Sequence, residues 1–483
     1  MKLREILSGI EILESSADMD AEIGGISYDS RHTRPGDLFV AVVGFESDGH
    51  DYIPMALEKG AAAVMCQTAP ERGNYVRVPD TRYALAIASK NFFGDPAGEM
   101  TMIGVTGTNG KTTSTLLIKH VLEHCRGAKV GLIGTTGNMI GGEFLPSERT
   151  TPESFELQKL LRGMADAGCR YVVMEVSSHA LALSRVEGIE FEIGIFTNLT
   201  QDHLDFHGSM EEYAKAKARL FSQCRRASLN CDDEYFAYMK SAARCPVTAF
   251  SAAGNDADLT AKDIELRPDR VSFLAAAGEE RAPVGLAIPG RFSVYNALGV
   301  ISGCMALGLT LDECADALAS AKGVKGRAES VPTDGDYTVL IDYAHTPDAL
   351  ENILRAVRET STGRVVALFG CGGDRDRKKR PIMGEIGVRE SDLAIITSDN
   401  PRTEDPDAII ADIVEGIFEE KSRYKVISDR VRAIEWAIEN HQDGDVIVLA
   451  GKGHETYQEI NHVKHHMDER EIVAEIMERR KNK

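Results

Sequence analysis

The sequence predicts an α/β protein with three domains, and three observations support that fold class. The chain has 483 residues, enough for about three domains of ~150 residues each. Apolar runs of strand length alternate with segments of helical spacing along most of the chain. Unusual polar sequences follow several of these runs, as expected where ligands bind beyond the carboxyl ends of parallel strands.

The first domain is predicted over residues 1–98 as a small N-terminal α/β module. Residues 38–43 and 61–66 are apolar runs of strand length. Between them, residues 53–59 have helical spacing, and Gly60 follows as a C-terminal cap. The sequence Asp95-Pro96-Ala97-Gly98 marks the change to the second domain.

The second domain is predicted over residues 99–326 as a mostly parallel, doubly wound sheet of the P-loop type. Its expected strands lie at residues 101–105, 128–134, 171–176 and 193–198, with helices between the first three. Later segments continue the domain. Residues 259–286 are expected to be richer in strands, and residues 296–307 to form an apolar helix.

A glycine-rich segment follows the first strand of this domain, Val-Thr-Gly-Thr-Asn-Gly-Lys-Thr-Thr at residues 105–113. A turn of this kind at a helix start presents backbone N–H groups to a phosphate. We expect Lys111 to reach the β- and γ-phosphates of ATP and the Thr112 hydroxyl to ligate Mg²⁺. Val105 stands where the common P-loop has glycine, and a tight turn without a ligand is the alternative.

The third domain, residues 327–483, is predicted as a Rossmann-like doubly wound sheet. Strands are expected at residues 338–342, 364–370, 393–399 and 446–451, and Thr346-Pro347 is expected to begin one of the helices. Polar sequences follow these strands at residues 342–345, 372–375, 399–402 and 451–455. Because they share one sheet edge, they predict a site rich in arginine.

Two further polar residues follow strands downstream of the glycine-rich segment. Glu175 ends one predicted strand and His203 follows another, which makes both candidate ligands of a nucleotide-bound metal. A purely structural role remains open for each. Lys217 lies in an amphipathic helix that favours a solvated basic face, and the spacing does not distinguish it from Lys215.

Composition narrows the functional class. Asp and Glu number 75 against 55 Lys and Arg, giving a net charge of −20 that opposes nucleic-acid binding. Local arginine clusters still permit small anionic substrates. The nine cysteines are scattered and predict reduced thiols. The sequence has neither 18 consecutive apolar residues nor a signal-peptide core at its start, so a cytoplasmic protein without membrane contact is expected.

Seven motifs, in order along all three domains, resemble those of the Mur ligases of peptidoglycan synthesis. They are the glycine-rich segment and residues 174–179, 198–205, 342–349, 370–375, 399–402 and 451–455. The resemblance implies a monomer with an N-terminal uridine-nucleotide domain, a central ATPase domain and a C-terminal amino-acid-binding domain.

The resemblance also implies an ATP-dependent amide ligase. In such an enzyme ATP converts the D-glutamyl side-chain carboxylate of UDP-N-acetylmuramoyl-L-alanyl-D-glutamate to an acyl phosphate. An incoming amine then attacks, and a tetrahedral intermediate collapses to amide and phosphate. Catalysis of this type depends mainly on positioning and charge neutralisation.

The resemblance assigns residue roles by position. Nucleotide contacts are expected from Gly107, Thr108, Asn109, Gly110, Lys111, Thr112, Thr113, Asn296, Arg327, Asp342 and His345. Mg²⁺ ligands are expected to be Thr112, Glu175, His203 and Lys217, the last as a CO₂-derived carbamate, and Lys111, Lys217, His203 and Glu175 are the expected catalytic residues. The UDP-sugar peptide is expected at Ser30, the loop after Val43, Thr150, Thr151, Ser177 and Arg185.

The added amino acid is expected to be meso-2,6-diaminopimelate, which carries one carboxylate more than L-lysine. The family associates Asp399, Asn400, Pro401 and Arg402 with that substrate, and Arg375, Gly451 and Glu455 complete the expected site. The Arg402 guanidinium offers a planar fork for the extra carboxylate. The alternative for Arg402 is an ion pair with Glu404 or Asp405.

Three other functions remain open at this point. The first is the same reaction with L-lysine, and the second is a ligase like folylpolyglutamate synthetase, which shares the phosphate loop. The third is a nucleotide-gated binding protein without ligase turnover. The third-domain arginines and the pair Glu175 and His203 argue against the last of these.

Overall fold

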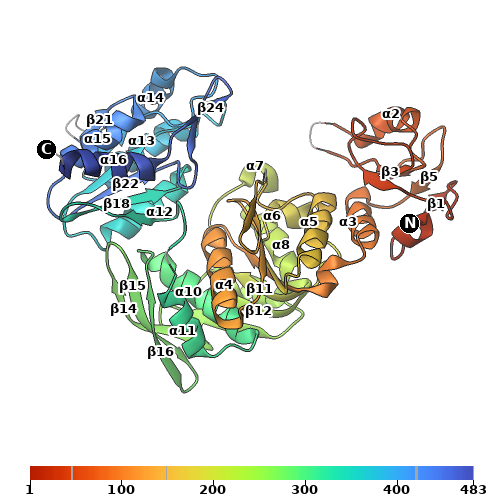
Figure 1. Ribbon diagram of the computed structural model, residues 1–483, viewed down its shortest axis with the longest axis horizontal. Helices are drawn as coiled ribbons and strands as arrows, with labels where there is room; N and C mark the ends of the chain where they lie inside the picture. Colours follow the sequence, from red (N-terminus) through yellow and green to blue (C-terminus); the bar gives the residue numbers. More distant parts are fainter. Residues whose placement is uncertain (45–46, 148, 322, 419–422, 482–483) are drawn as a thin grey trace. The chain divides into compact units, whose positions relative to one another are not determined.

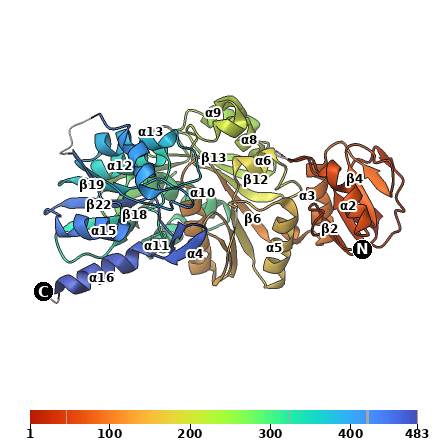
Figure 2. The same ribbon diagram turned by 90° about the horizontal axis from the view of Figure 1, so that it is seen from above.

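The computed structural model describes residues 1–44, 47–147, 149–321, 323–418 and 423–481, the side chain of residue 205 excepted. The chain divides into two units, residues 1–250 with 302–309 and residues 251–301 with 310–483. Figures 1 and 2 label the helices and strands of both. In the described part of the chain, no helix is both long and apolar enough to cross a membrane.

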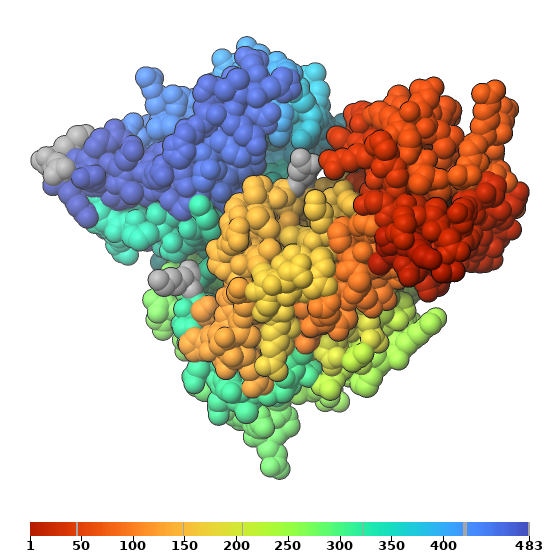
Figure 3. Space-filling view, turned by 45° about the vertical axis from the view of Figure 1, so that its right-hand side comes forward, coloured from red at the N-terminus to blue at the C-terminus, as the bar shows by residue number. Residues whose placement is uncertain are grey.

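The first 98 residues of unit 1 form a small sheet with the strand order β1-β5-β4-β3-β2. Strands β2 to β5 pair in parallel, and β1 is antiparallel to β5. Its helices and strands are α1 (Leu3–Ile6), β1 (Glu14–Ser15), β2 (Gly25–Ser27), β3 (Asp37–Val40), α2 (Ile53–Glu58), β4 (Ala63–Cys66), β5 (Tyr75–Arg77) and α3 (Thr81–Phe92). Figure 3 shows the surface of this module in red to orange.

The rest of unit 1 is built on the strand order β13-β12-β11-β6-β10-β7-β8-β9. The pairs from β13 to β7 are parallel, whereas β8 and β9 form an antiparallel hairpin beside β7. The elements are β6 (Thr101–Thr106), α4 (Lys111–Arg126), β7 (Val130–Ile133), β8 (Asn138–Ile140), β9 (Glu143–Leu145), α5 (Ser154–Asp166), β10 (Tyr171–Glu175), α6 (Ser178–Ala182), β11 (Phe191–Phe196), α7 (Leu204–His207), α8 (Met210–Ala218), β12 (Cys224–Asn230), α9 (Phe236–Ala242) and β13 (Val247–Ser251).

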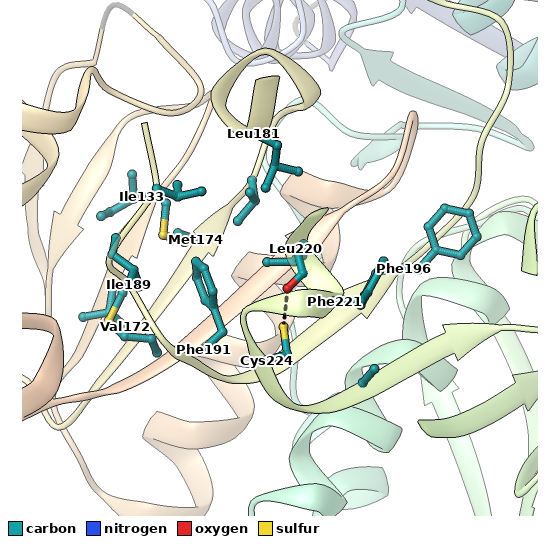
Figure 4. Close-up of a cluster of buried hydrophobic side chains, with 14 of the residues drawn as sticks. Ile133, Val172, Met174, Leu181, Ile189, Phe191, Phe196, Leu220, Phe221 and Cys224 are labelled. Atoms are coloured by element: carbon teal, nitrogen blue, oxygen red, sulfur yellow. Dashed lines mark hydrogen bonds between the residues drawn. The ribbon is translucent and has the colours of Figure 1, made fainter. Parts of the chain in front are cut away.

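Apolar side chains on this sheet and its helices form the core of unit 1. Figure 4 shows Phe191 and Met174 from the strands beside Leu220 and Phe221, which follow α8. The Cys224 thiol donates to the Leu220 carbonyl at 3.0 Å. This core fixes α8 against the sheet and so determines where its polar side chains lie.

Unit 2 begins with an antiparallel meander and continues into a six-stranded sheet of order β17-β18-β22-β19-β20-β21. All pairs of the larger sheet are parallel except β17 with β18. The meander and its helices are β14 (Leu259–Leu266), β15 (Val271–Ala277), β16 (Glu280–Leu286), α10 (Arg291–Ala306) and α11 (Leu311–Ala319). The end of α10, from residue 302, belongs to unit 1.

The larger sheet of unit 2 carries helices between its strands. Its elements are β17 (Glu329–Val331), β18 (Tyr337–Asp342), α12 (Pro347–Arg358), β19 (Val365–Phe369), α13 (Lys379–Glu390), β20 (Leu393–Ile396), α14 (Pro406–Val414), β21 (Tyr424–Val426), α15 (Arg430–Glu439), β22 (Asp445–Ala450), β23 (Tyr457–Ile460), β24 (Val463–His466) and α16 (Glu469–Lys481). Strands β23 and β24 form a separate antiparallel hairpin. Figure 2 shows α16 running to the C-terminus.

The predicted α/β class with parallel-rich sheets is confirmed. Thr346 caps α12 as predicted, its hydroxyl accepting from the Ala349 N–H at 3.3 Å. The short strands β8, β9, β17, β21, β23 and β24 were not predicted. They are three or four residues long, too short to show a hydrophobic period.

One buried arginine links the ends of two strands in the larger sheet. Arg430, at the start of α15, is 2% exposed and forms an ion pair of 2.8 Å with Glu469. It also donates to the Ala450 carbonyl at 2.8 Å and to the Ser398 carbonyl at 3.5 Å. Ala450 ends β22 and Ser398 follows β20, so one guanidinium spans β19, which lies between them.

Candidate active site

The glycine-rich segment forms a tight loop between β6 and α4, as predicted. Gly107 and Gly110 adopt φ values of +151° and +86°, which favour glycine. A Cβ at Gly107 would lie 1.9 Å from Thr197 Oγ1, so a larger residue does not fit there. The Thr108 N–H donates to the Asn198 carbonyl at 2.9 Å, which fixes the loop to the segment after β11.

Two lysines donate to the carbonyls of this loop. Lys111 Nζ lies 2.8 Å from the Gly107 carbonyl oxygen and 2.7 Å from that of Thr108. Lys217 Nζ, from α8, lies 2.7 Å from the same Gly107 oxygen. The loop therefore brings together Lys111 and Lys217, two of the predicted site residues.

Lys217 is buried, with 1% of its surface exposed, whereas Lys215 is exposed. Its ammonium lies 4.5 Å from the centre of the Tyr213 ring. Burial lowers the pKa of Lys217 well below the ordinary lysine value, and the charge of Lys111 lowers it further. The solvated basic face suggested by helical spacing is therefore wrong for Lys217, because the tight packing of α8 turns this side chain toward the phosphate loop.

Glu175 lies at the carboxyl end of β10, opposite Val105 in the parallel register with β6. It is 1% exposed, and its carboxylate accepts from the Thr135 N–H at 2.9 Å and hydroxyl at 3.0 Å. Within the described residues it forms no ion pair. A buried carboxylate without a cationic partner is suited to hold a cation.

His203 is the residue before α7 and has a left-handed conformation, with φ of +53°. Its Nε2 lies 3.2 Å from an Asp202 carboxylate oxygen, and its ring centre lies 4.8 Å from that of His179. The Tyr213 ring, 6.3 Å away, places His203 in the same neighbourhood as Lys217. A histidine cluster was not expected from the sequence, although His179 lies in the motif at residues 174–179.

The predicted Mg²⁺ donors suit the ion in their chemistry. Thr112, which is 6% exposed, and Glu175 offer oxygen atoms, and a carbamate on Lys217 would add more. In its protonated form, unmodified Lys217 carries only donors and cannot ligate a cation. Among the described residues, no group of three or more His, Cys, Asp or Glu side chains is arranged to hold a metal. The predicted set contains only two residues of those types, so it stays a prediction.

Four residues predicted for the UDP-sugar peptide lie together beside Glu175. The Thr151 hydroxyl donates to the Glu175 carbonyl at 2.8 Å and lies 3.3 Å from the Ser177 hydroxyl. Arg185 donates to the Thr151 carbonyl at 3.1 Å. The Thr150 hydroxyl lies 2.9 Å from that of Thr135, which also contacts Glu175.

Arg185 is the charged member of that cluster. It forms an ion pair of 2.6 Å with Glu153, and its Nε is buried with no hydrogen-bond partner among the described residues. Burial lowers the pKa of Arg185, while the Glu153 charge opposes the shift. The Arg185 guanidinium is already desolvated by burial, so an anionic ligand that binds beside it would displace little water from this group.

Ser30 belongs to the N-terminal module. It is 5% exposed and its hydroxyl donates to the Met55 sulfur at 3.3 Å. Residues 45 and 46, in the loop after Val43, lie outside the described residues. No contact of the structure joins Ser30 to the Thr151 cluster within the described residues, so its role stays a prediction.

The third-domain motifs meet in unit 2 around a buried lysine. Lys452 is fully buried, and its Nζ donates to Asn400 Oδ1 at 2.7 Å and to a Glu455 carboxylate oxygen at 2.8 Å. The Asn400 amide also donates to Glu455 at 2.9 Å. Lys452 was not among the predicted site residues, although it lies within a motif that was.

Asp399, Gly451 and Pro401 lie in the same two loops. Asp399 is 7% exposed, and its carboxylate lies 3.9 Å from Lys452 Nζ. Gly451 has φ of +113°, and a Cβ there would lie 2.5 Å from an Asp399 carboxylate oxygen. Pro401 packs against Gly373, where a Cβ would lie 1.9 Å from the Pro401 oxygen. Gly451 and Gly373 therefore permit their loops to approach the loop of residues 399–402 closely.

Arg402 pairs with a residue that the sequence did not suggest. Its Nε lies 3.2 Å from a Glu459 carboxylate oxygen, and its Nη1 donates to the Gly373 carbonyl at 2.7 Å. Glu404 pairs instead with Arg380 at 2.7 Å, and the Asp405 side chain caps α14. The predicted alternative partners of Arg402 are therefore wrong. Arg375 lies exposed beside this loop and donates to its neighbour's carbonyl at 3.1 Å.

The nucleotide residues predicted for unit 2 lie on α10 and around Tyr343. Asn296 is buried on α10, with 4% of its surface exposed. The Arg327 guanidinium lies 5.0 Å from the centre of the Tyr343 ring, and the His345 ring lies 4.7 Å from it. Asp342 accepts backbone N–H bonds from Ala328 and Ala344 at 2.7 and 2.8 Å. Arg327, Asp342 and His345 are thus brought together within unit 2.

Three family models match the chain. The catalytic-domain model of the Mur ligase family matches residues 22–107, the Mur ligase middle domain residues 105–304, and the Mur ligase glutamate ligase domain residues 326–453. Together they span most of the chain in the order of the three predicted segments.

Full-length relatives and a solved structure agree with these matches. A Clostridium acetobutylicum protein named UDP-N-acetylmuramoyl-L-alanyl-D-glutamate--2,6-diaminopimelate ligase 1 is 46% identical, with 99% of each chain covered. A Clostridioides difficile protein of the same activity name is 45% identical over 99% of each chain. A solved structure with that activity in its title has a TM-score of 0.75 at 34% identity, covering 100% of this chain and 99% of the other.

Proposed function

The chain belongs to the Mur ligase family, and from that premise we propose that it is the ATP-dependent ligase adding meso-2,6-diaminopimelate to UDP-N-acetylmuramoyl-L-alanyl-D-glutamate. The observation that carries the proposal is the full-length similarity to relatives whose names state this one activity. The product is a precursor of peptidoglycan. The protein acts as a monomer in the cytoplasm, with small molecules as its partners.

The phosphate loop and Lys111 hold the phosphates of ATP. The D-glutamyl side-chain carboxylate attacks the γ-phosphorus, a new O–P bond forms, and the bond to ADP breaks. Thr112, Glu175, His203 and carbamylated Lys217 would hold Mg²⁺, which would supply positive charge to offset that of the phosphates. Thr151, Ser177 and Arg185 position the peptide carboxylate beside Glu175, because they form one connected cluster with it.

The second half of the reaction needs a bound amine. The amino group of diaminopimelate attacks the acyl carbon, loses a proton, and inorganic phosphate leaves as the amide forms. Arg402, Asn400, Asp399, Gly451 and Glu455 bind the amino acid, with Arg375 beside them, and residues 327–483 form its domain. Residues 1–98 bind the uridine nucleotide through Ser30, and residues 99–326 form the ATPase domain.

The reaction is tested by phosphate release from ATP with purified protein. Release that requires both the UDP-dipeptide and diaminopimelate supports the proposal. Release that requires a folate with glutamate instead would identify the rival ligase, and release without any acceptor would contradict both.

The choice of amino acid is tested separately. A site built to pair an arginine with a substrate carboxylate discriminates by about 10⁴-fold against an amino acid that lacks this carboxylate. We expect kcat/KM for diaminopimelate to exceed that for L-lysine by that order, and Arg402→Ala to weaken diaminopimelate use selectively. Equal values for the two amino acids, or a preference for lysine, would favour the L-lysine reaction.

A further inference from the structure

The β23–β24 hairpin is bonded along residues 399–402 by both backbone and side chains. The Arg402 N–H donates to the Glu459 carbonyl at 3.0 Å, and the Asn461 N–H donates to the Arg402 carbonyl at 2.7 Å. The Glu459 N–H donates to Asn400 Oδ1 at 2.8 Å. Gln458 donates to the Asp399 carbonyl at 2.7 Å. The hairpin thus acts as a short extra strand beside the loop.

This contact holds Arg402 in an unfavourable backbone conformation. Its φ of +52° lies in the left-handed region, where a non-glycine residue is strained. Such a conformation persists only where surrounding contacts enforce it. The two backbone hydrogen bonds to the hairpin supply that enforcement. The direction of the Arg402 side chain therefore depends on the hairpin.

The guanidinium of Arg402 is fixed at two of its nitrogens. Glu459 contacts Nε at 3.2 Å, and the Gly373 carbonyl accepts from Nη1 at 2.7 Å. Arg402 and Glu459 are each 19% exposed, so solvent only partly screens their charges. The Nη2 end carries no hydrogen bond among the described residues, which leaves it able to donate to a ligand.

We propose that Glu459 is a positioning residue that determines selection of the amino-acid substrate by orienting Arg402. The proposal rests on the proposed function. Glu459 holds one edge of the Arg402 guanidinium. The remaining N–H groups of Arg402 can then bind a second carboxylate, and the Arg402 side chain loses little further conformational entropy on binding. Diaminopimelate carries that carboxylate and L-lysine does not. Glu459 touches neither substrate in this role and acts only through Arg402.

The test compares Glu459→Ala and Glu459→Gln with a matched control. A charge-assisted hydrogen bond corresponds to roughly 10–100-fold in an equilibrium constant. We expect Glu459→Ala to raise the KM for diaminopimelate about tenfold or more, with kcat and the KM for ATP changed less than about threefold. Glu459→Gln keeps the size and an acceptor for Arg402 Nε, so its effect should be smaller. The ratio of kcat/KM for diaminopimelate to kcat/KM for L-lysine should fall more in Glu459→Ala than in Glu459→Gln.

The control is Glu435→Gln, which breaks an exposed ion pair of 2.9 Å with Arg479 on the same unit. It should leave all constants unchanged. A Glu459→Ala variant that alters every constant together, or none, would overturn the proposal. If Glu459→Ala does not fold, an unchanged substrate ratio in the nearly isosteric Glu459→Gln overturns it. Wild-type turnover that needs no amino acid would instead contradict the proposed function.

Discussion

At the scale of single residues, the side chains that matter most differ from their neighbours in burial rather than in type. Lys215 and Lys217 lie two positions apart on α8, so they point to different sides of the helix. The sequence alone could not separate them, because the spacing of this amphipathic helix does not distinguish Lys217 from Lys215. Only the packing of α8 shows that Lys217 faces the phosphate loop.

Replacing Lys217 tests its modification. We expect Lys217→Ala to lose about 10²-fold or more of kcat, because a group that stabilises charge at the phosphates is removed. Added acetate or formate should restore part of the activity by supplying a carboxylate in the vacated space. Lys215→Ala, on the exposed side of α8, is the control and should retain activity. Loss of activity without rescue would argue against a carbamate.

His454 gives a pH dependence of stability. Burial, followed by the charge of Arg327, lowers the pKa of His454 from the ordinary 6.5 to about 4. Between these values the unfolded chain binds the proton and the folded protein does not, so the free energy of unfolding falls as the pH falls through this window.

We expect the wild-type protein to lose more stability between pH 7.5 and 5 than His454→Gln does. Urea unfolding at the two pH values measures this difference. His465→Gln, at an exposed histidine of the hairpin, is the control and should follow the wild type. Parallel losses in all three proteins would contradict the assignment to His454.

At the scale of elements, most of the longer strands were predictable, whereas β12, β13 and the short strands were not. The four buried residues of α12, Leu350, Ile353, Leu354 and Val357, recur in the sequence at helical spacing. The hairpin β23–β24 has exposed or half-buried residues throughout, so no apolar alternation marked it. For that reason the partner of Arg402 could not be predicted.

Gly451, in the loop after β22, allows a test of how closely this loop must approach Asp399. Gly451→Ala should destabilise the protein and raise the KM for diaminopimelate, because its Cβ would lie 2.5 Å from the Asp399 carboxylate. Gly278→Ala is the control for a left-handed glycine without a close contact, since Gly278 has φ of +57° and nothing lies within 4 Å of its would-be Cβ. Left-handed strain alone costs about 1–2 kcal/mol. Equal unfolding free energies and KM values for the two variants would show that the clash has no effect.

At the scale of the whole molecule, site residues come from loops far apart in sequence that the sheets bring together. The motifs indicated which loops these are, because each follows a strand. They could not indicate Lys452 as the central cation, nor the cluster around Tyr213, because those depend on side-chain packing between elements. Fold class was therefore more predictable than side-chain partnership.

Nucleotide binding should stabilise the whole protein. A non-hydrolysable ATP analogue with Mg²⁺ at 100 times its Kd should raise the free energy of unfolding by about 2.7 kcal/mol. Lys111→Ala should reduce this gain, because the lysine of the phosphate loop no longer meets the phosphates. Denaturant titration with and without the analogue measures both. An equal gain in Lys111→Ala would contradict the assigned role of Lys111.

Arg430 has a consequence for how substrate choice could be altered. It joins the end of β22 to the residue after β20, and the loops that follow these two positions carry Gly451 and Arg402. The Arg430 side chain thus sets the spacing between these two loops, although it does not contact the binding groups of either loop. A redesign of the amino-acid site for a longer or shorter substrate would therefore begin at the ion pair of Arg430 and Glu469, because this pair sets the distance between the two loops.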